Sequence, residues 1–404
     1  SPQLGGRARG LDWKGQRLDN GQHILLGAYR DTLGLMQLAG VDMSQALLRL
    51  PLQLVMHRRF QLEAFKYLPA PLHVLAGLLS AQGLSWKERW SAIRFMAWLR
   101  GIGFQLDHDL PLETLLSQRS QPDAVTRCLW EPLCLAALNT PLREASAQVF
   151  LNVLRDSFAK AKADSDMLLP KQDLTRMLAE PLSGYIRSQG GQVRLGVAIT
   201  GIRHTPQGFE LATAQGTGRY SHVVVATSPF RTGELLAALP EMGPSRQLID
   251  ALTYQPIYTV YLQYPSEIRL DAPMLGFAEG YGQWVFDRGQ LYGQHGLMAI
   301  VISAEGRHQA MTQERLAEAV TEEMTQHFPG LPVPLWHKVI AEKRATFACT
   351  HDLQRPAAIT AVAGLYLAGD YVAGDYPATI EGAVRSGLYC ADHIIQHTFA
   401  GAIP

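Results

Sequence analysis

A strand, an acidic turn and the start of a helix follow one another near the end of the chain, and this order constrains the fold most. Residues 364–369 are a short apolar strand that Asp370 closes. After a short loop, residues 378–396 have the pattern of a helix, with Pro377 and Thr379 as residues that start helices. Such a helix N-terminus binds anions, because its dipole and free amides face the ligand. The alternative is an ordinary βα unit without a ligand.

A second candidate phosphate-binding segment, Gly5-Gly6-Arg7, lies at the start of the sequence. The glycines let the backbone approach a phosphate closely, and the arginine supplies a charged, forked donor. A glycine-rich surface turn is the alternative. Together, the two ends of the chain resemble the flavin-dependent amine oxidase and phytoene desaturase superfamily.

In that superfamily, the G-G-R segment follows a dinucleotide-binding βαβ unit that carries G-x-G-x-x-G. No such motif precedes Gly5, and residues 101–103 lie in a helical region and lack the third glycine. We therefore expect that the sequence lacks about 30 residues, the length of one βαβ unit. We also expect that the chain beginning at Ser1 holds FAD poorly.

Three internal segments narrow the resemblance to one branch, the hydroxysqualene dehydroxylases of squalene and hopanoid biosynthesis. They are D-N-G-Q-H at residues 19–23, E-P-L-C at residues 131–134 and S-D-M-L-L-P at residues 165–170. The resemblance covers residues 1 to about 395. It implies an FAD-dependent oxidoreductase of isoprenoid lipid metabolism.

The resemblance also implies an α/β (α+β) fold, in which an FAD-binding Rossmann-like domain of the amine oxidase type carries an inserted helix-rich substrate domain. We assign residues 1–40, 181–230 and 341–404 to the FAD-binding domain, and residues 41–180 and 231–340 to the substrate domain. Periodicity predicts helices and strands within this division. The helices are at 145–154, 174–186 and 313–327; the strands are at 209–214, 220–226, 257–264 and 296–303, with a strand, turn and strand at 190–199.

The composition excludes several classes of protein. Thirty-six basic residues balance 36 acidic ones, so no basic field is available for nucleic acid. The four cysteines form no C-x-x-C pair, which indicates buried thiols and no metal site. No apolar run is long enough for a membrane-spanning helix. We expect a cytoplasmic protein.

One segment would also suit a peripheral place on the inner face of the cytoplasmic membrane. Residues 86–100 hold three of the seven tryptophans and four basic residues against one acidic residue. Helices of this kind can lie in a bilayer interface with their cations among the headgroups. The alternative is a core helix whose basic residues face water.

The resemblance assigns roles to individual residues. The pyrophosphate of FAD would lie against Gly5, Gly6 and Arg7, and the adenine against the backbone of Val197. A ribityl or phosphate hydroxyl of the flavin side would bind the turn Gly369-Asp370, and the amides near Ile380 and Glu381 would face the flavin N1–C2 edge. The catalytic candidates are His23, Asp19 and Asp166. Glu131 and Asp164 are rival acids, and the proton donor stays open.

The substrate that the resemblance implies is hydroxysqualene, an apolar polyprene with one allylic hydroxyl. Its reductive dehydroxylation gives squalene: the departing oxygen needs a proton, and reduced flavin delivers hydride to the allylic carbon. The sequence does not name the electron donor. A desaturase or amine oxidase of the same superfamily would remove hydride instead. A non-catalytic carrier of prenyl lipids is a further alternative.

Overall fold

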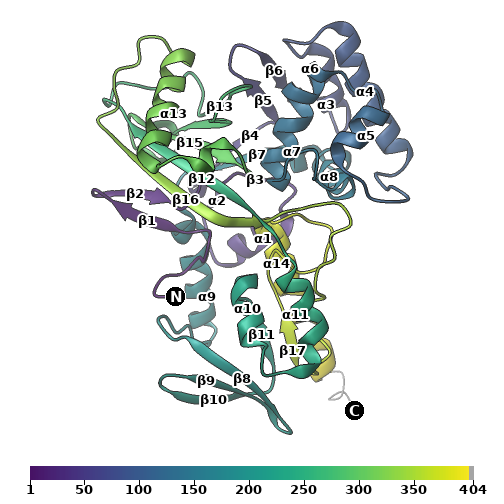
Figure 1. Ribbon diagram of the computed structural model, residues 1–404, viewed down its shortest axis with the longest axis vertical. Helices are drawn as coiled ribbons and strands as arrows, with labels where there is room; N and C mark the ends of the chain where they lie inside the picture. The colour runs from purple at the N-terminus through teal and green to yellow at the C-terminus, as the bar shows by residue number, and fades with distance from the viewer. Residues whose placement is uncertain (400–404) are drawn as a thin grey trace.

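The computed structural model describes residues 1–399, and its largest sheet has seven strands (Figure 1). All neighbouring strands of this sheet are antiparallel except β13 and β5, which are parallel. In spatial order, the strands are β16 (Trp336–Phe347), β12 (Tyr254–Gln263), β15 (Leu297–Ser303), β14 (Trp284–Asp287), β13 (Met274–Gly276), β5 (Gln53–Met56) and β6 (Phe60–Glu63).

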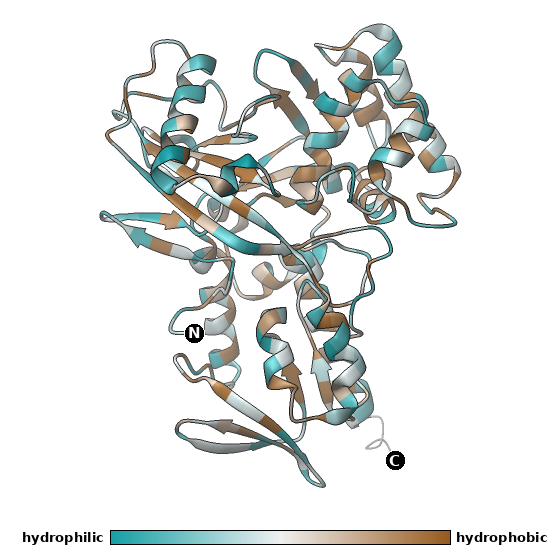
Figure 2. Cartoon of the chain, viewed as in Figure 1, coloured by the Kyte–Doolittle hydropathy of each residue, from teal (hydrophilic) through white to brown (hydrophobic). Residues whose placement is uncertain are grey.

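The two faces of this sheet pack against different cores, because successive side chains of a strand point to opposite faces. Val285 of β14 packs into the cluster that includes Leu316 and Val320 of helix α13 (Gln313–His327). Its neighbours Trp284 and Phe286 belong to the larger cluster on the other face. Figure 2 shows brown, apolar segments along the strands of this sheet, which lies between the two cores.

A group of helices stands beside the β5–β6 end of the sheet (Figure 1). A capping box of Ser85 and Glu88 begins the longest of them, α4. Three π-helical turns also occur, at Thr126–Trp130, Arg155–Ala159 and Thr175–Ala179. The helices are α3 (Leu72–Ser80), α4 (Trp86–Gly101), α5 (Leu112–Gln118), α6 (Asp123–Val125), α7 (Glu131–Leu138) and α8 (Ala147–Leu154).

The lower part of the molecule in Figure 1 is built on two parallel strands, β11 (Val223–Val225) and β17 (Leu365–Leu367). Around them lie α9 (Glu180–Ser188), α10 (Pro229–Leu235), α11 (Gly243–Asp250), α14 (Ile380–Phe399) and the sheet of β8 (Ile199–Thr205), β9 (Gly208–Thr213) and β10 (Gly216–Tyr220).

The remaining α-helices and strands form small units near the middle of the molecule (Figure 1). They are the hairpin β1 (Gly10–Trp13) and β2 (Gln16–Asp19), the sheet of β3 (Leu25–Leu26), β7 (Met167–Pro170) and β4 (Leu47–Leu50), and the helices α1 (Arg30–Leu38), α2 (Met43–Ala46) and α12 (Arg288–Tyr292). Within residues 1–399, no helix is long and apolar enough to cross a membrane.

The α/β fold class is confirmed, and helix α13 has the predicted bounds. The prediction of a strand, turn and strand at 190–199 is wrong: residues 192–198 are irregular, and β8 begins at Ile199. The glycines at 190 and 196 have positive φ angles, which breaks the strand. The helix-rich region 41–180 also holds β4 to β7. The division into domains stays a prediction.

The cysteine prediction is confirmed for three of the four residues. Cys134, Cys349 and Cys390 are buried, whereas Cys128 is half-buried, and all four are free thiols. Among the described residues, no cluster of His, Cys, Asp and Glu could hold a metal ion.

Candidate active site

The two ends of the chain meet at the turn after β17. The guanidinium of Arg7 donates to Asp370 Oδ1 at 2.6 Å and also to the carbonyl of Ala345. Asp370 is 8% exposed. The ion pair therefore joins the predicted pyrophosphate-binding loop to the predicted flavin-side acid across 363 positions of sequence.

Glycine is required on both sides of this junction. Gly5 and Gly6 have φ angles of 99° and 59°, and Gly369 has 150°. A Cβ atom at Gly5 would lie 2.4 Å from a backbone oxygen, whereas nothing within 4 Å would meet one at Gly6. The loop thus presents bare backbone to open space at Gly6. The amide of Gly196 donates to the carbonyl of Ser1 at 2.8 Å, which places the segment of Val197 beside the same loop.

Helix α14 begins next to this junction. Thr379 Oγ1 accepts the amide of Gly382 at 3.1 Å and so caps the helix. The fully buried carboxylate of Glu381 accepts the amide and hydroxyl of Thr32, at 2.9 and 2.7 Å, and so caps helix α1. The side chain of Glu381 is thus engaged by α1 and by Arg385, and it leaves the backbone amides at the start of α14 for a cofactor.

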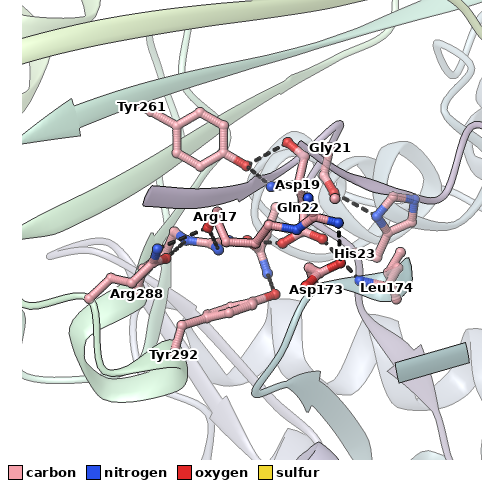
Figure 3. Close-up of polar contacts among 12 residues, drawn as sticks. Arg17, Asp19, Gly21, Gln22, His23, Asp173, Leu174, Tyr261, Arg288 and Tyr292 are labelled. Carbon is pink, nitrogen blue, oxygen red and sulfur yellow. Dashed lines mark hydrogen bonds and ion pairs between the residues drawn. The ribbon is translucent and has the colours of Figure 1, made fainter. Parts of the chain in front are cut away.

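The segment at residues 19–23 is held by a buried arginine (Figure 3). Arg288 is fully buried and donates at 3.0 Å to both Asp19 Oδ2 and Gln22 Oε1. Its guanidinium lies over the ring of Tyr292, 3.6 Å from the centroid. Asp19 also accepts the amide of Leu174 at 3.1 Å. Asp19 is therefore an ion-pair partner that fixes the segment, and sequence analysis missed Arg288 because it lies 269 positions away.

His23 lies at the end of this clamped segment. Its Nδ1 is 2.6 Å from the carbonyl oxygen of Gly21, so Nδ1 carries the proton that this contact needs. Burial lowers the pKa of His23, and the charge of Arg7 adds to that effect, whereas Asp19 opposes it. The imidazole is therefore neutral at pH 7.

Two of the other predicted acids have ion-pair partners. Asp166 accepts from Arg49 Nε at 2.6 Å, and Asp164 binds the guanidinium of Arg30 at 2.8 Å. Burial raises the pKa of Glu131, at the start of α7. None of these three residues lines the cavity described next.

A mainly apolar cavity of about 130 Å³, which opens into a wider space connected to solvent, extends from the start of α14 into the upper part of the molecule. Its apolar lining includes Ile24, Leu54, Leu133, Phe150, Met167 and Trp284. Tyr376, Pro377 and Thr379, directly before α14, line its other end. The cavity thus connects the helix start expected to face the flavin with the apolar core.

Two polar residues that sequence analysis missed stand in this cavity. Asp156 and Tyr376 are 5% and 8% exposed, and the tyrosine hydroxyl donates to Asp156 Oδ2 at 2.9 Å. The only sequence feature that could have identified Tyr376 as a site residue is its position just before the start of α14. Asp156 gives no signal, because a lone acid in a helical segment is usually solvated.

The tryptophan-rich segment forms helix α4, which has a buried face and an exposed face. Phe95 and Leu99 are buried, whereas Trp86 and Trp90 are 63% and 49% exposed. Arg89 does not face outward with the two tryptophans. Its guanidinium donates to the carbonyl of Leu79, in the last turn of α3, and to the carbonyl of Leu84, which follows α3. The exposed cations next to the two tryptophans are Lys87 and Arg94.

Comparison with known proteins assigns the chain to a family. The flavin containing amine oxidoreductase family matches residues 1–395. A hydroxysqualene dehydroxylase of Zymomonas mobilis is 26% identical over 72% of this chain. A 15-cis-phytoene desaturase of Solanum lycopersicum is 25% identical over 97% of this chain and 72% of its own length. The chain spans 61 to 67% of the length of the three hydroxysqualene dehydroxylases it matches.

Solved structures agree with this assignment at the level of the fold. An oxidoreductase of Methanosarcina mazei superposes with a TM-score of 0.72 at 14% identity, over 96% of this chain and 92% of that one. The junction described above suits a dinucleotide, because it joins positive-φ glycines, an arginine, a carboxylate and a helix N-terminus. The chain therefore belongs to the flavin containing amine oxidoreductase family and is an oxidoreductase with FAD as its cofactor.

Proposed function

We propose that the protein catalyses the reductive dehydroxylation of hydroxysqualene to squalene. The observation that carries the proposal is the cavity, which is mainly apolar and ends at the loop that begins α14. Three relatives named hydroxysqualene dehydroxylase, at 26 to 29% identity, support the same reaction.

The lining of the cavity suits a long hydrocarbon. Aliphatic and aromatic side chains from β3, β5, α7, α8 and β14 contribute to it. Burial of apolar surface stabilises such a ligand by about 25 cal/mol per Å². Amines would find a worse site, because a cation loses its hydration there and the carboxylate of Asp156 in the lining is already paired with Arg155 and Lys160.

The reaction replaces a C–O bond by a C–H bond. The departing oxygen takes a proton and leaves as water, and an external reductant supplies the two electrons. When bound, reduced FAD supplies the hydride. The chain itself must hold the allylic carbon near the start of α14 and keep water away from it, which the apolar lining does.

The residues that we propose for the cofactor are those of the junction. Arg7 and the backbone of Gly5 and Gly6 would hold the pyrophosphate, and Val197 would contact the adenine through its backbone. The Gly369-Asp370 turn and the first amides of α14 would hold the flavin side. His23 does not itself line the cavity but directly precedes Ile24, which does. We retain His23 as the proposed proton-carrying residue, because Asp19 and Asp166 are engaged in ion pairs.

The test is product analysis. Protein loaded with added FAD and incubated with a reductant and hydroxysqualene should give squalene, with the flavin reoxidised only when hydroxysqualene is present. If no squalene forms while phytoene-like substrates or amines are oxidised, the protein is a desaturase or an amine oxidase. If there is no flavin turnover but the hydrocarbon binds, the protein is a carrier.

A polyprene desaturase is the second candidate. It is favoured by the match to phytoene desaturases, which extends over 97% of this chain. The same cavity would hold either hydrocarbon. The two reactions differ in the direction of hydride transfer, so the assay above separates them.

A further inference from the structure

One buried polar pair interrupts the apolar lining of the cavity, and neither the cofactor junction nor the proposed acids account for it. Tyr376 donates its hydroxyl proton to Asp156 Oδ2 at 2.9 Å, and both side chains line the cavity. A charged or polar group in such surroundings is costly unless it is fully paired. The surrounding structure therefore has to stabilise this pair.

Basic partners keep the carboxylate ionised. Asp156 Oδ1 accepts from Arg155 Nε and Lys160 Nζ, each at 2.9 Å. Burial alone would raise the pKa of Asp156, but hydrogen bonds from Arg155, Lys160 and Tyr376 lower it to about 2. The carboxylate is thus an acceptor at any physiological pH. Tyr376 must then donate to it, which leaves a lone pair on the phenolic oxygen free to accept.

The backbone around the pair is specialised. Asp156 lies in the π-helical turn Arg155–Ala159 at the end of α8, and its neighbour Ser157 also lines the cavity. Such turns shift the direction of side chains and occur frequently at functional sites. Asn152 of α8 donates to the carbonyl of Asp375 at 3.2 Å and so ties this helix to the loop of Tyr376.

The ring of Tyr376 also contacts a cation from helix α14. The guanidinium of Arg385 in α14 lies 4.5 Å from the centroid of the Tyr376 ring. Pro377 and Thr379, which follow the tyrosine, line the same end of the cavity. The phenolic oxygen is therefore held at the boundary between the apolar cavity and the start of α14.

We propose that Tyr376 and Asp156 form the hydroxyl-binding site of the cavity, an inference that rests on the proposed function. The substrate hydroxyl donates to the phenolic oxygen of Tyr376, which donates to the carboxylate of Asp156. Chains of hydrogen bonds that end on a charge strengthen one another. Both lone pairs of the substrate oxygen remain free for the proton that its departure requires.

This arrangement makes the pair a determinant of specificity. Squalene has the carbon skeleton of the substrate but lacks the hydroxyl, so it would leave the accepting lone pair of the phenolic oxygen without a donor. A buried polar group that loses its partner disfavours the wrong ligand. The site thus distinguishes an alcohol from the hydrocarbon that is released as product.

The decisive variant is Tyr376→Phe. A hydrogen bond between two uncharged groups typically contributes about 0.5–1.5 kcal/mol, which corresponds to about 2- to 12-fold. We expect kcat/KM for hydroxysqualene to fall by about that factor, with the flavin content unchanged. The inhibition constant of squalene should stay the same or fall, because the substitution removes the hydroxyl that squalene leaves without a donor.

A matched control and a second variant accompany this test. Tyr264→Phe removes another buried phenolic hydroxyl, from the opposite core and outside the cavity, and should leave both constants unchanged. Asp156→Asn keeps an acceptor oxygen but removes the charge. It should weaken the binding of hydroxysqualene less than Tyr376→Phe does, and the inhibition by squalene should be unchanged.

The outcomes separate this inference from the proposed function. If wild-type protein makes squalene and Tyr376→Phe retains the wild-type preference for hydroxysqualene over squalene, the hydroxyl-binding role is wrong. An equal loss of affinity for hydroxysqualene and squalene would also overturn it, since that result indicates a purely structural role. If the wild-type protein itself makes no squalene, the proposed function fails first.

Discussion

The buried ion pair of Arg288 and Asp19 gives the sharpest prediction about stability. The two side chains are 0% and 2% exposed. Arg288→Met would remove the donors to Asp19 and Gln22 and leave the carboxylate with one described donor, the amide of Leu174. Removal of one partner from a buried pair costs about 3–5 kcal/mol, because the remaining charge stays in an apolar environment. We expect a destabilisation of that size.

The assay is urea unfolding, followed by tryptophan fluorescence, of the wild type, both single variants and the double variant Arg288→Met/Asp19→Leu. Removal of both charges should recover much of the loss, because an apolar pair leaves no uncompensated charge. Arg59→Met is the matched control, since its ion pair with Glu279 is 62% and 76% exposed and should contribute less than about 1 kcal/mol. Strictly additive effects of the two buried changes would refute the reasoning.

Three further predictions concern the cofactor, the membrane and pH. Asp370→Ala should lower FAD affinity by about 10- to 150-fold, as measured by flavin titration, because it removes a charged acceptor. Unchanged FAD binding would mean that Asp370 is not the carboxylate that binds the flavin side of the cofactor. Lys87→Glu with Arg94→Glu should weaken binding to anionic vesicles, at about 1 kcal/mol per basic residue, and equal sedimentation would make α4 an ordinary surface helix. If His23 carries the proton, its lowered pKa means that the rate rises as pH falls below 6.5, and His23→Gln should flatten that pH–rate profile.

Local patterns predicted much of the secondary structure. Apolar spacing predicted α13, and β12 and β15 follow from runs of apolar and β-branched residues. The prediction failed at residues 190–199, where glycines with positive φ replace a strand. It also missed β5 and β6, which are four residues each and gain their stability only from the sheet that they extend.

For the functional site, the sequence by itself determined the residues that act through backbone conformation or short motifs. Gly5, Gly6 and the Gly369-Asp370 turn are recognisable because a positive φ angle or a helix start needs particular residue types. Tertiary structure alone decided which side chains meet. Asp156 joins Tyr376 across 220 positions, and Asp19 joins Arg288 across 269. A buried charge is stabilised only by partners at hydrogen-bond distance, and no local pattern specifies partners so far apart in the chain.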